Sequence, residues 1–157
     1  MGPKRTIRIG IRGTTEVLWE YSYQTGMEVI HIEAFYEAGW RNVVSQIREK
    51  VGRGPTYISF DIDCLDPAFA PGTGTPVAGG MTTLDALQVL RGLRGLNVVD
   101  GDVVEVSPPY DVSGVTALAG ATLMFEILCL TAESPIWGSQ ERNKASLMSP
   151  SKKREEA

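Results

Sequence analysis

A strand that runs into a cluster of carboxylates constrains this chain more than any other feature. The apolar run 57–60 leads directly into Asp61-Ile62-Asp63. Because side chains alternate along a strand, Asp61 and Asp63 are expected on one side and Ile62 on the other. Two like charges at a buried strand end need a shared proton, basic partners or a cation. Carboxylate oxygens suit hard cations such as Mg, Ca and Mn.

Each of these acidic residues also has a simpler interpretation. Asp61 and Asp63 could cap a turn, with Asp66-Pro67 starting the next one. Glu105, which follows the apolar run 103–104, could pair with a nearby arginine. The single histidine, His31, is better explained as a strand residue with a satisfied hydrogen bond than as a ligand, and we leave it out of the candidate site.

Composition bounds the class of protein. A chain of 157 residues with 43% hydrophobic content is long enough for one compact domain. Its net charge of -4 provides no basic surface for nucleic acid or for an anionic membrane. We find no secretory signal and expect no stretch of membrane-spanning length, so the predicted location is cytoplasmic, although an organelle-targeting segment upstream of Met1 stays open.

Periodicity predicts strands that alternate with helices. The expected strands are 7–11, 27–32, 56–61 and 96–106, and the expected helices are 17–23, 40–51, a segment beginning near Thr82 or Thr83, and 115–130. In the third helix, an inner stripe is predicted at Leu84, Leu87, Leu90 and Leu93. This order predicts an α/β fold with a parallel sheet of about four strands, covered on both faces.

A long loop follows the strand 56–61 and its aspartates. Residues 64–81 are rich in Gly, Pro and Thr, and loops of this length in compact domains are usually functional. Ligand sites of parallel sheets lie beyond the carboxyl ends of the strands. If the third and fourth strands are neighbours, Asp61, Asp63 and Glu105 converge on one crevice there.

Three separate motifs, in order, resemble the ureohydrolase (arginase/agmatinase) superfamily. They are Ser-Phe-Asp-Ile-Asp-Cys-Leu-Asp-Pro at 59–67, Gly-Thr-Gly-Thr-Pro at 72–76 and Glu-Val-Ser-Pro-Pro-Tyr-Asp at 105–111. The third is more similar to agmatinases than to true arginases, and the resemblance runs from about residue 5 to about residue 130. It implies a three-layer α/β/α fold and a hydrolase with two Mn²⁺ ions that acts on a small guanidino substrate.

The resemblance also implies roles for individual residues. Asp61 would bridge both manganese ions and act in catalysis, and Asp63 would be a terminal metal ligand. Glu105 would bind the substrate guanidinium and take part in catalysis, with Thr75 as a weaker candidate that supports Glu105. Tyr110, beside Glu105, is the one aromatic residue that merits a test in a substrate pocket.

The sequence departs from the family pattern in one respect. The pattern has a Gly-Gly-Asp-His segment and an Asp-Ala-His-x-Asp segment upstream of the aspartate strand, and neither occurs here, so four expected metal ligands are absent. The chain is therefore interpreted as a carboxyl-terminal half, residues 1–133, followed by a disordered tail, residues 134–157. Such a half would cut the family's sheet and leave an unpaired strand edge and bare apolar helix faces. We expect these surfaces to drive homo-oligomerisation or association with a missing amino-terminal half.

The expected reaction is the hydrolysis of agmatine to putrescine and urea, as in polyamine biosynthesis, with this chain inactive alone. One alternative is a guanidinobutyrase or a related guanidino-acid hydrolase. Another is a non-catalytic fragment or isoform that associates with a full-length enzyme.

Overall fold

Strands and helices alternate along the chain, as predicted. The computed structural model describes residues 2–13 and 16–137. The elements, in order, are β1 (Ile7–Ile11), α1 (Glu16–Thr25), β2 (Glu28–His31), α2 (Ile32–Ala38), α3 (Trp40–Val51), β3 (Thr56–Asp61), α4 (Thr83–Gly92), β4 (Val98–Val104) and α5 (Val115–Ala132). Short 3₁₀ turns cover Pro3–Arg5, Ile62–Cys64 and Pro108–Tyr110.

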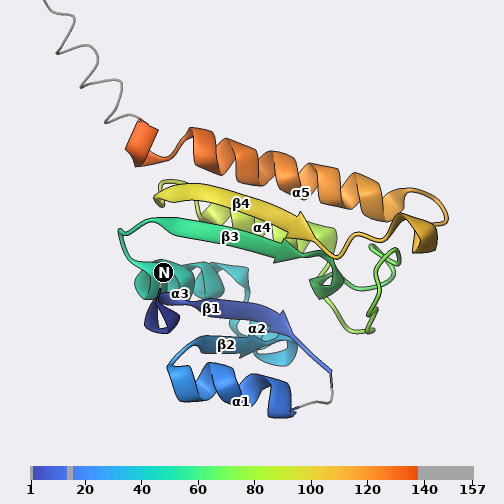
Figure 1. Cartoon of the computed structure of the whole chain (residues 1–157), viewed down its shortest axis with the longest axis horizontal. Helices are drawn as coiled ribbons and strands as arrows, with labels where there is room; N and C mark the ends of the chain where they lie inside the picture. Colours follow the sequence, from blue (N-terminus) through green and yellow to red (C-terminus); the bar gives the residue numbers. More distant parts are fainter. Residues whose placement is uncertain (1, 14–15, 138–157) are drawn as a thin grey trace, which may run out of the picture.

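The strands form two parallel pairs in place of the single sheet that we predicted. β1 pairs with β2, and β3 pairs with β4. All four strands point the same way, and the two pairs lie one above the other in Figure 1. Within the described residues, β1 and β3 are not hydrogen-bonded to each other. Each pair therefore keeps an inner edge whose backbone groups lack a strand partner in this part of the chain.

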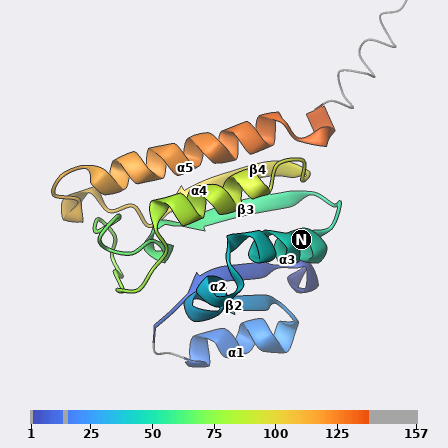
Figure 2. The same cartoon turned by 180° about the vertical axis from the view of Figure 1, so that it is seen from behind.

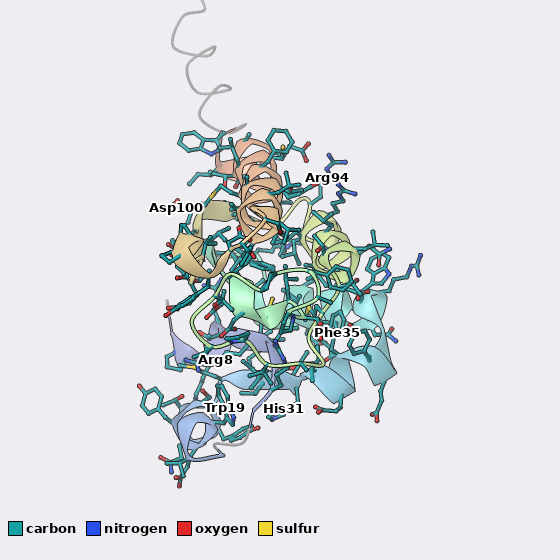
Figure 3. The ribbon with its side chains drawn as sticks, turned by 90° about the vertical axis from the view of Figure 1, so that its right-hand side faces the viewer. Arg8, Trp19, His31, Phe35, Arg94 and Asp100 are labelled. Carbon is teal, nitrogen blue, oxygen red and sulfur yellow. The ribbon has the colours of Figure 1, made fainter. Side chains whose placement is uncertain are left out.

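Helices cover the strands unevenly. Figure 2 shows α2, α3 and α4 in front of the strands, and Figure 3 shows α1 on the opposite side. The predicted cover on both faces is therefore present only in part, because no described helix lies over the face of the β3–β4 pair that carries Tyr57 and Asp100. Tyr57 is 39% exposed, and its hydroxyl donates a hydrogen bond of 2.7 Å to Asp102 Oδ2.

The core forms where the helix stripes meet the strands. In α3, the predicted stripe of Val43, Val44, Ile47 and Val51 is buried. In α4, Leu90 and Leu93 are buried, but Leu84 is 59% exposed and Ala86 is buried instead. A spacing of three residues falls behind the helical period by about 60° a step, so the stripe drifts around the helix. The prediction for Leu84 is therefore wrong.

The start of α4 matches its sequence signal. The Thr82 side chain accepts a hydrogen bond from the Asp85 amide, and the Asp85 side chain accepts one from the Thr82 amide. This reciprocal pair satisfies two amides that the first helical turn leaves free. Thr82, one of the two predicted caps, is the cap that the structure has.

α5 packs along β4 and leaves an apolar face bare. Ala119, Leu123 and Ile127 are buried. A Cβ at Gly101 of β4 would lie 2.6 Å from the Ile58 carbonyl oxygen and 2.7 Å from Ile127, so glycine permits this close approach. The opposite face of the helix exposes large side chains, among them Leu118, Phe125 and Leu128.

The expectation that no stretch reaches membrane-spanning length is wrong. Residues Val115–Trp137 are long and apolar enough to span a bilayer by length and composition, with a mean hydropathy of 1.8 in the best window. A core helix passes the same test, and 33% of that window is buried inside the molecule. Packing of α5 against β4 and α4 therefore already accounts for part of this hydrophobicity.

Two other predicted boundaries differ from the structure. The predicted strand 27–32 ends at His31, and Ile32 begins α2, a helix that the sequence analysis did not predict. Most of the predicted tail lies outside the described residues, and its disorder stays a prediction. Of its first residues, Ser134 is buried and its hydroxyl donates a hydrogen bond of 3.0 Å to Asn97 Oδ1.

Candidate functional site

The acidic residues lie at the carboxyl ends of two neighbouring strands. β3 ends at Asp61, which is in register with Val104, and Glu105 follows directly. The predicted adjacency of these strands is therefore confirmed. Figure 3 looks onto this end of the strands. Asp61 and Glu105 are exposed, and Asp63 is half-buried.

Asp61 carries an electrostatic penalty in this position. The pKa of its carboxyl group is raised from 3.8 to about 6, mainly because of partial burial and also because of the negative charges of Asp63 and Glu105, while a hydrogen bond from the Asp63 amide opposes the shift. That amide donates to Asp61 Oδ1 at 3.2 Å. The mutual influence of the three carboxylates shows that they share one site.

Asp63 reaches the site from a turn, not from a strand. Residues Ile62–Cys64 form a 3₁₀ turn, so the alternation that we assumed from the sequence ends at Asp61. Ile62 is nevertheless fully buried, which anchors the turn between the two aspartates. The capping interpretation is thus correct for Asp61, whose side chain caps this turn. The same carboxylate is also exposed at the acidic edge.

Thr75 contacts a different partner from the one that the resemblance implied. Its hydroxyl donates a hydrogen bond of 2.8 Å to Asp63 Oδ2, not to Glu105. The 3₁₀ turn directs the Asp63 carboxylate toward the long loop, where Thr75 lies. A threonine hydroxyl here fixes one oxygen of Asp63 and leaves the other oxygen available.

Glu105 has an uncommon backbone conformation. Its φ angle is 64°, in the left-handed region that non-glycine residues rarely adopt. The alternative that it pairs with an arginine finds no support, because the ion pairs among the described residues are Lys50–Glu28, Arg91–Glu126 and Arg94–Glu133. Strained residues of this kind are concentrated at functional sites.

The long loop 64–81 is held in place at both ends. Leu65 and Met81 form a parallel bridge. The Asp66 carboxylate accepts hydrogen bonds from the amides of Ala68, Gly79 and Gly80, and these bonds lower its pKa. The side chain that joins the loop to the aspartate turn is Arg12, a residue that the sequence analysis did not single out.

Two hollows of the described surface lie away from the acidic edge. One is lined by Arg48, Arg53 and Leu96, and the other by Trp19, Tyr23 and His31. Tyr23 Oη and His31 Nε2 are 2.8 Å apart, which agrees with the interpretation of His31 as a hydrogen-bonded residue. The acidic edge is open among the described residues, since Asp61 and Glu105 are exposed. Tyr110 is 62% exposed at the same end.

The residues present fit one part of a manganese site. Asp61 and Asp63 offer hard oxygen donors of the kind that Mn²⁺ prefers. Within the described residues, no group of three or more His, Cys, Asp or Glu side chains could hold a metal ion. The described residues thus offer a pair of candidate ligands and not a complete binuclear centre.

Comparisons with known proteins agree with this geometry. The chain is 58% identical over 136 residues to a guanidinopropionase of Pseudomonas aeruginosa, which covers 85% of this chain and 43% of that protein. It is 51% identical over 130 residues to an agmatinase of Proteus mirabilis, covering 83% and 40% respectively. The solved structure of a proclavaminate amidino hydrolase from Streptomyces clavuligerus superimposes with a TM-score of 0.80 at 41% identity, covering 85% of this chain and 44% of that one.

The chain thus spans about two fifths of the length of the curated relatives that it matches. The model of the arginase family matches residues 1–130, which include both strand pairs and all three motifs. The chain belongs to the arginase family.

Proposed function

We propose that this chain supplies the carboxyl-terminal part of the active site of a manganese-dependent guanidino hydrolase. The single observation that carries the proposal is the convergence of Asp61, Asp63 and Glu105 at the ends of β3 and β4. Both relatives named above are guanidino hydrolases by name, which supports the same reaction class. The products are urea and an amine.

In this proposal, Asp61 and Asp63 would hold manganese and Glu105 would hold the substrate. Divalent ions that share carboxylate ligands lower the pKa of water and so supply hydroxide near neutral pH. Thr75 orients the Asp63 carboxylate through its hydrogen bond of 2.8 Å. Glu105 accepts the fork of donors of a planar guanidinium, which directs the guanidinium carbon toward the aspartate pair.

The left-handed backbone of Glu105 gives this role a physical basis. β4 ends at Val104, and a residue that continued it as a regular strand would have a negative φ angle. At 64°, the backbone of Glu105 departs from the strand conformation, and the Glu105 carboxylate lies close enough to influence the Asp61 pKa. Substrate bound to Glu105 is thereby brought beside the metal ligands.

The substrate is a linear guanidino compound. Identity is higher to the guanidinopropionase, at 58%, than to the agmatinase, at 51%. This difference supports guanidinopropionate ahead of agmatine, which the sequence motifs had favoured. The two substrates differ at the end remote from the guanidinium, where one carries an anion and the other a cation.

The proposal is tested by urea release with Mn²⁺ from guanidinopropionate, guanidinobutyrate and agmatine. The chain is assayed alone and with the part of the Pseudomonas aeruginosa guanidinopropionase that lies outside the match. Activity is expected only in the mixture, and Glu105→Gln is expected to abolish it. A mixture that forms a complex but releases no urea from any of the three would contradict the hydrolase and support a non-catalytic associating chain.

A further inference from the structure

Arg12 joins two segments that are far apart in the sequence. It follows β1, and its guanidinium donates hydrogen bonds to the carbonyl oxygens of Asp63 at 2.5 Å, Leu65 at 3.1 Å and Cys64 at 3.3 Å. It also donates twice to the Val77 carbonyl oxygen, at 3.0 Å from Nε and 2.7 Å from Nη2. One side chain thus satisfies the backbone of both the aspartate turn and the long loop.

The two segments that Arg12 joins are the ones that meet in the site. Val77 lies two residues after Thr75, and Asp63 is the residue whose carboxylate accepts from Thr75 at 2.8 Å. The same Nη2 atom contacts the carbonyl oxygens of Asp63 and Val77. The guanidinium therefore fixes the separation of the two backbones, and with it the contact between Thr75 and Asp63.

A planar guanidinium is suited to this task and an ammonium is not. Its N–H donors form a rigid fork, and here they diverge toward four carbonyl oxygens. A lysine carries the same charge but cannot match these directions. The positive charge also faces the acidic turn, where it adds to the backbone hydrogen bonds that lower the pKa of Asp66.

We infer that Arg12 is a positioning residue that sets the geometry of Asp63 by clamping the aspartate turn to the Thr75 loop. The inference rests on the proposed function for its catalytic meaning. The clamp itself is a property of the chain, so it can be tested even if the hydrolase proposal fails. Partners that orient a metal ligand typically contribute roughly 10- to 100-fold to metal affinity or activity.

The first test measures amide hydrogen exchange in the full 157-residue chain. Gly79 and Gly80, whose amides donate to Asp66, report on closure of the loop. Arg12→Gln and Arg12→Lys are both expected to accelerate their exchange at least tenfold, while the amides of β3 and β4 keep their protection. Arg8→Gln is the matched control, because Arg8 is exposed on β1, the strand that Arg12 follows (Figure 3).

The second test measures Mn²⁺ affinity and urea release in the mixture described above. Arg12→Lys is expected to weaken Mn²⁺ binding and kcat by roughly 10- to 100-fold and to leave KM for the guanidino substrate within twofold. A purely structural role would lower the melting temperature without this split between kcat and KM.

Two results would overturn the inference. One is unchanged exchange of the Gly79 and Gly80 amides in both Arg12 variants. The other is acceleration in Arg12→Lys that spreads equally over β3 and β4, which would mean that Arg12 supports the whole fold. If the wild-type mixture neither binds Mn²⁺ nor releases urea, the proposed function fails, and the exchange experiment still decides the clamp.

Discussion

The bare face of α5 predicts that the chain alone self-associates. Leu118, Phe125 and Leu128 are 67%, 64% and 62% exposed on a helix whose other side packs along β4. Exposed apolar patches of this kind mark interaction surfaces. The perturbation is the triple replacement of these residues by glutamine, which keeps helix propensity while it removes the apolar surface.

The magnitude follows from the exposed fractions. Complete burial of a leucine or phenylalanine side chain is worth about 1.5–3 kcal/mol. Since each of the three side chains has about two thirds of its surface exposed, covering them contributes about 3–6 kcal/mol in total. At 1.4 kcal/mol for each factor of ten, the triple variant loses roughly 10²- to 10⁴-fold in association constant.

Size-exclusion chromatography with light scattering provides the assay. The wild-type chain is expected to elute above its monomer mass of 17.1 kDa, and the triple variant close to it. Leu84→Gln is the control, because Leu84 is 59% exposed on α4 and lies outside the α5 face. A wild-type monomer with one cooperative thermal transition would refute the reasoning.

Three further predictions concern stability. Gly101→Ala is expected to cost about 1–3 kcal/mol in urea unfolding, because its Cβ would lie 2.6 Å from the Ile58 carbonyl oxygen; an unchanged midpoint would mean that α5 does not approach β4 so closely. The pKa of Asp66 is lowered on folding, so its contribution to stability is present above the ordinary pKa near 3.8 and is lost as the pH falls through the lower folded value. The melting temperature of Asp66→Asn should therefore change less between pH 5 and pH 2 than that of the wild-type chain. Parallel curves of melting temperature against pH for the two proteins would count against this. Glu105→Gly should stabilise the chain by about 1 kcal/mol, since glycine relieves the left-handed strain, and should abolish urea release in the mixture. Glu105→Gln should abolish urea release without the gain in stability. Equal stability of the two variants would argue against strain at Glu105.

Local signals predicted the elements that frame the site. β3 could be placed from an apolar run that ends in aspartates, and the cap of α4 from Thr82 and its partner Asp85. The adjacency of β3 and β4 followed from the β-α-β order, since sequential parallel strands tend to be neighbours. These predictions depend on interactions among residues close in the sequence, or on the right-handed connection that joins successive parallel strands.

Other features depend on contacts that no local pattern reveals. α2 was missed because residues 29–32, Val-Ile-His-Ile, have the composition of a strand throughout. What separates the strand from the helix that begins at Ile32 is the burial of Phe35 in the core, which is not visible in the local sequence. Arg12 was missed because its acceptors lie more than 50 residues away and are backbone carbonyls, which any sequence provides. The hydroxyl of Thr75 was expected from the family resemblance to support Glu105, whereas it donates to the Asp63 carboxylate, which the 3₁₀ turn brings to it.

Calorimetric titration with Mn²⁺ tests the central claim most directly. The wild-type chain mixed with the unmatched part of the guanidinopropionase is expected to bind two ions, whereas the chain alone binds at most one, weakly. The double variant Asp61→Asn, Asp63→Asn, mixed in the same way, is expected to lose both tight sites. Two tight sites in the chain alone, or undiminished binding by the double variant, would contradict the account.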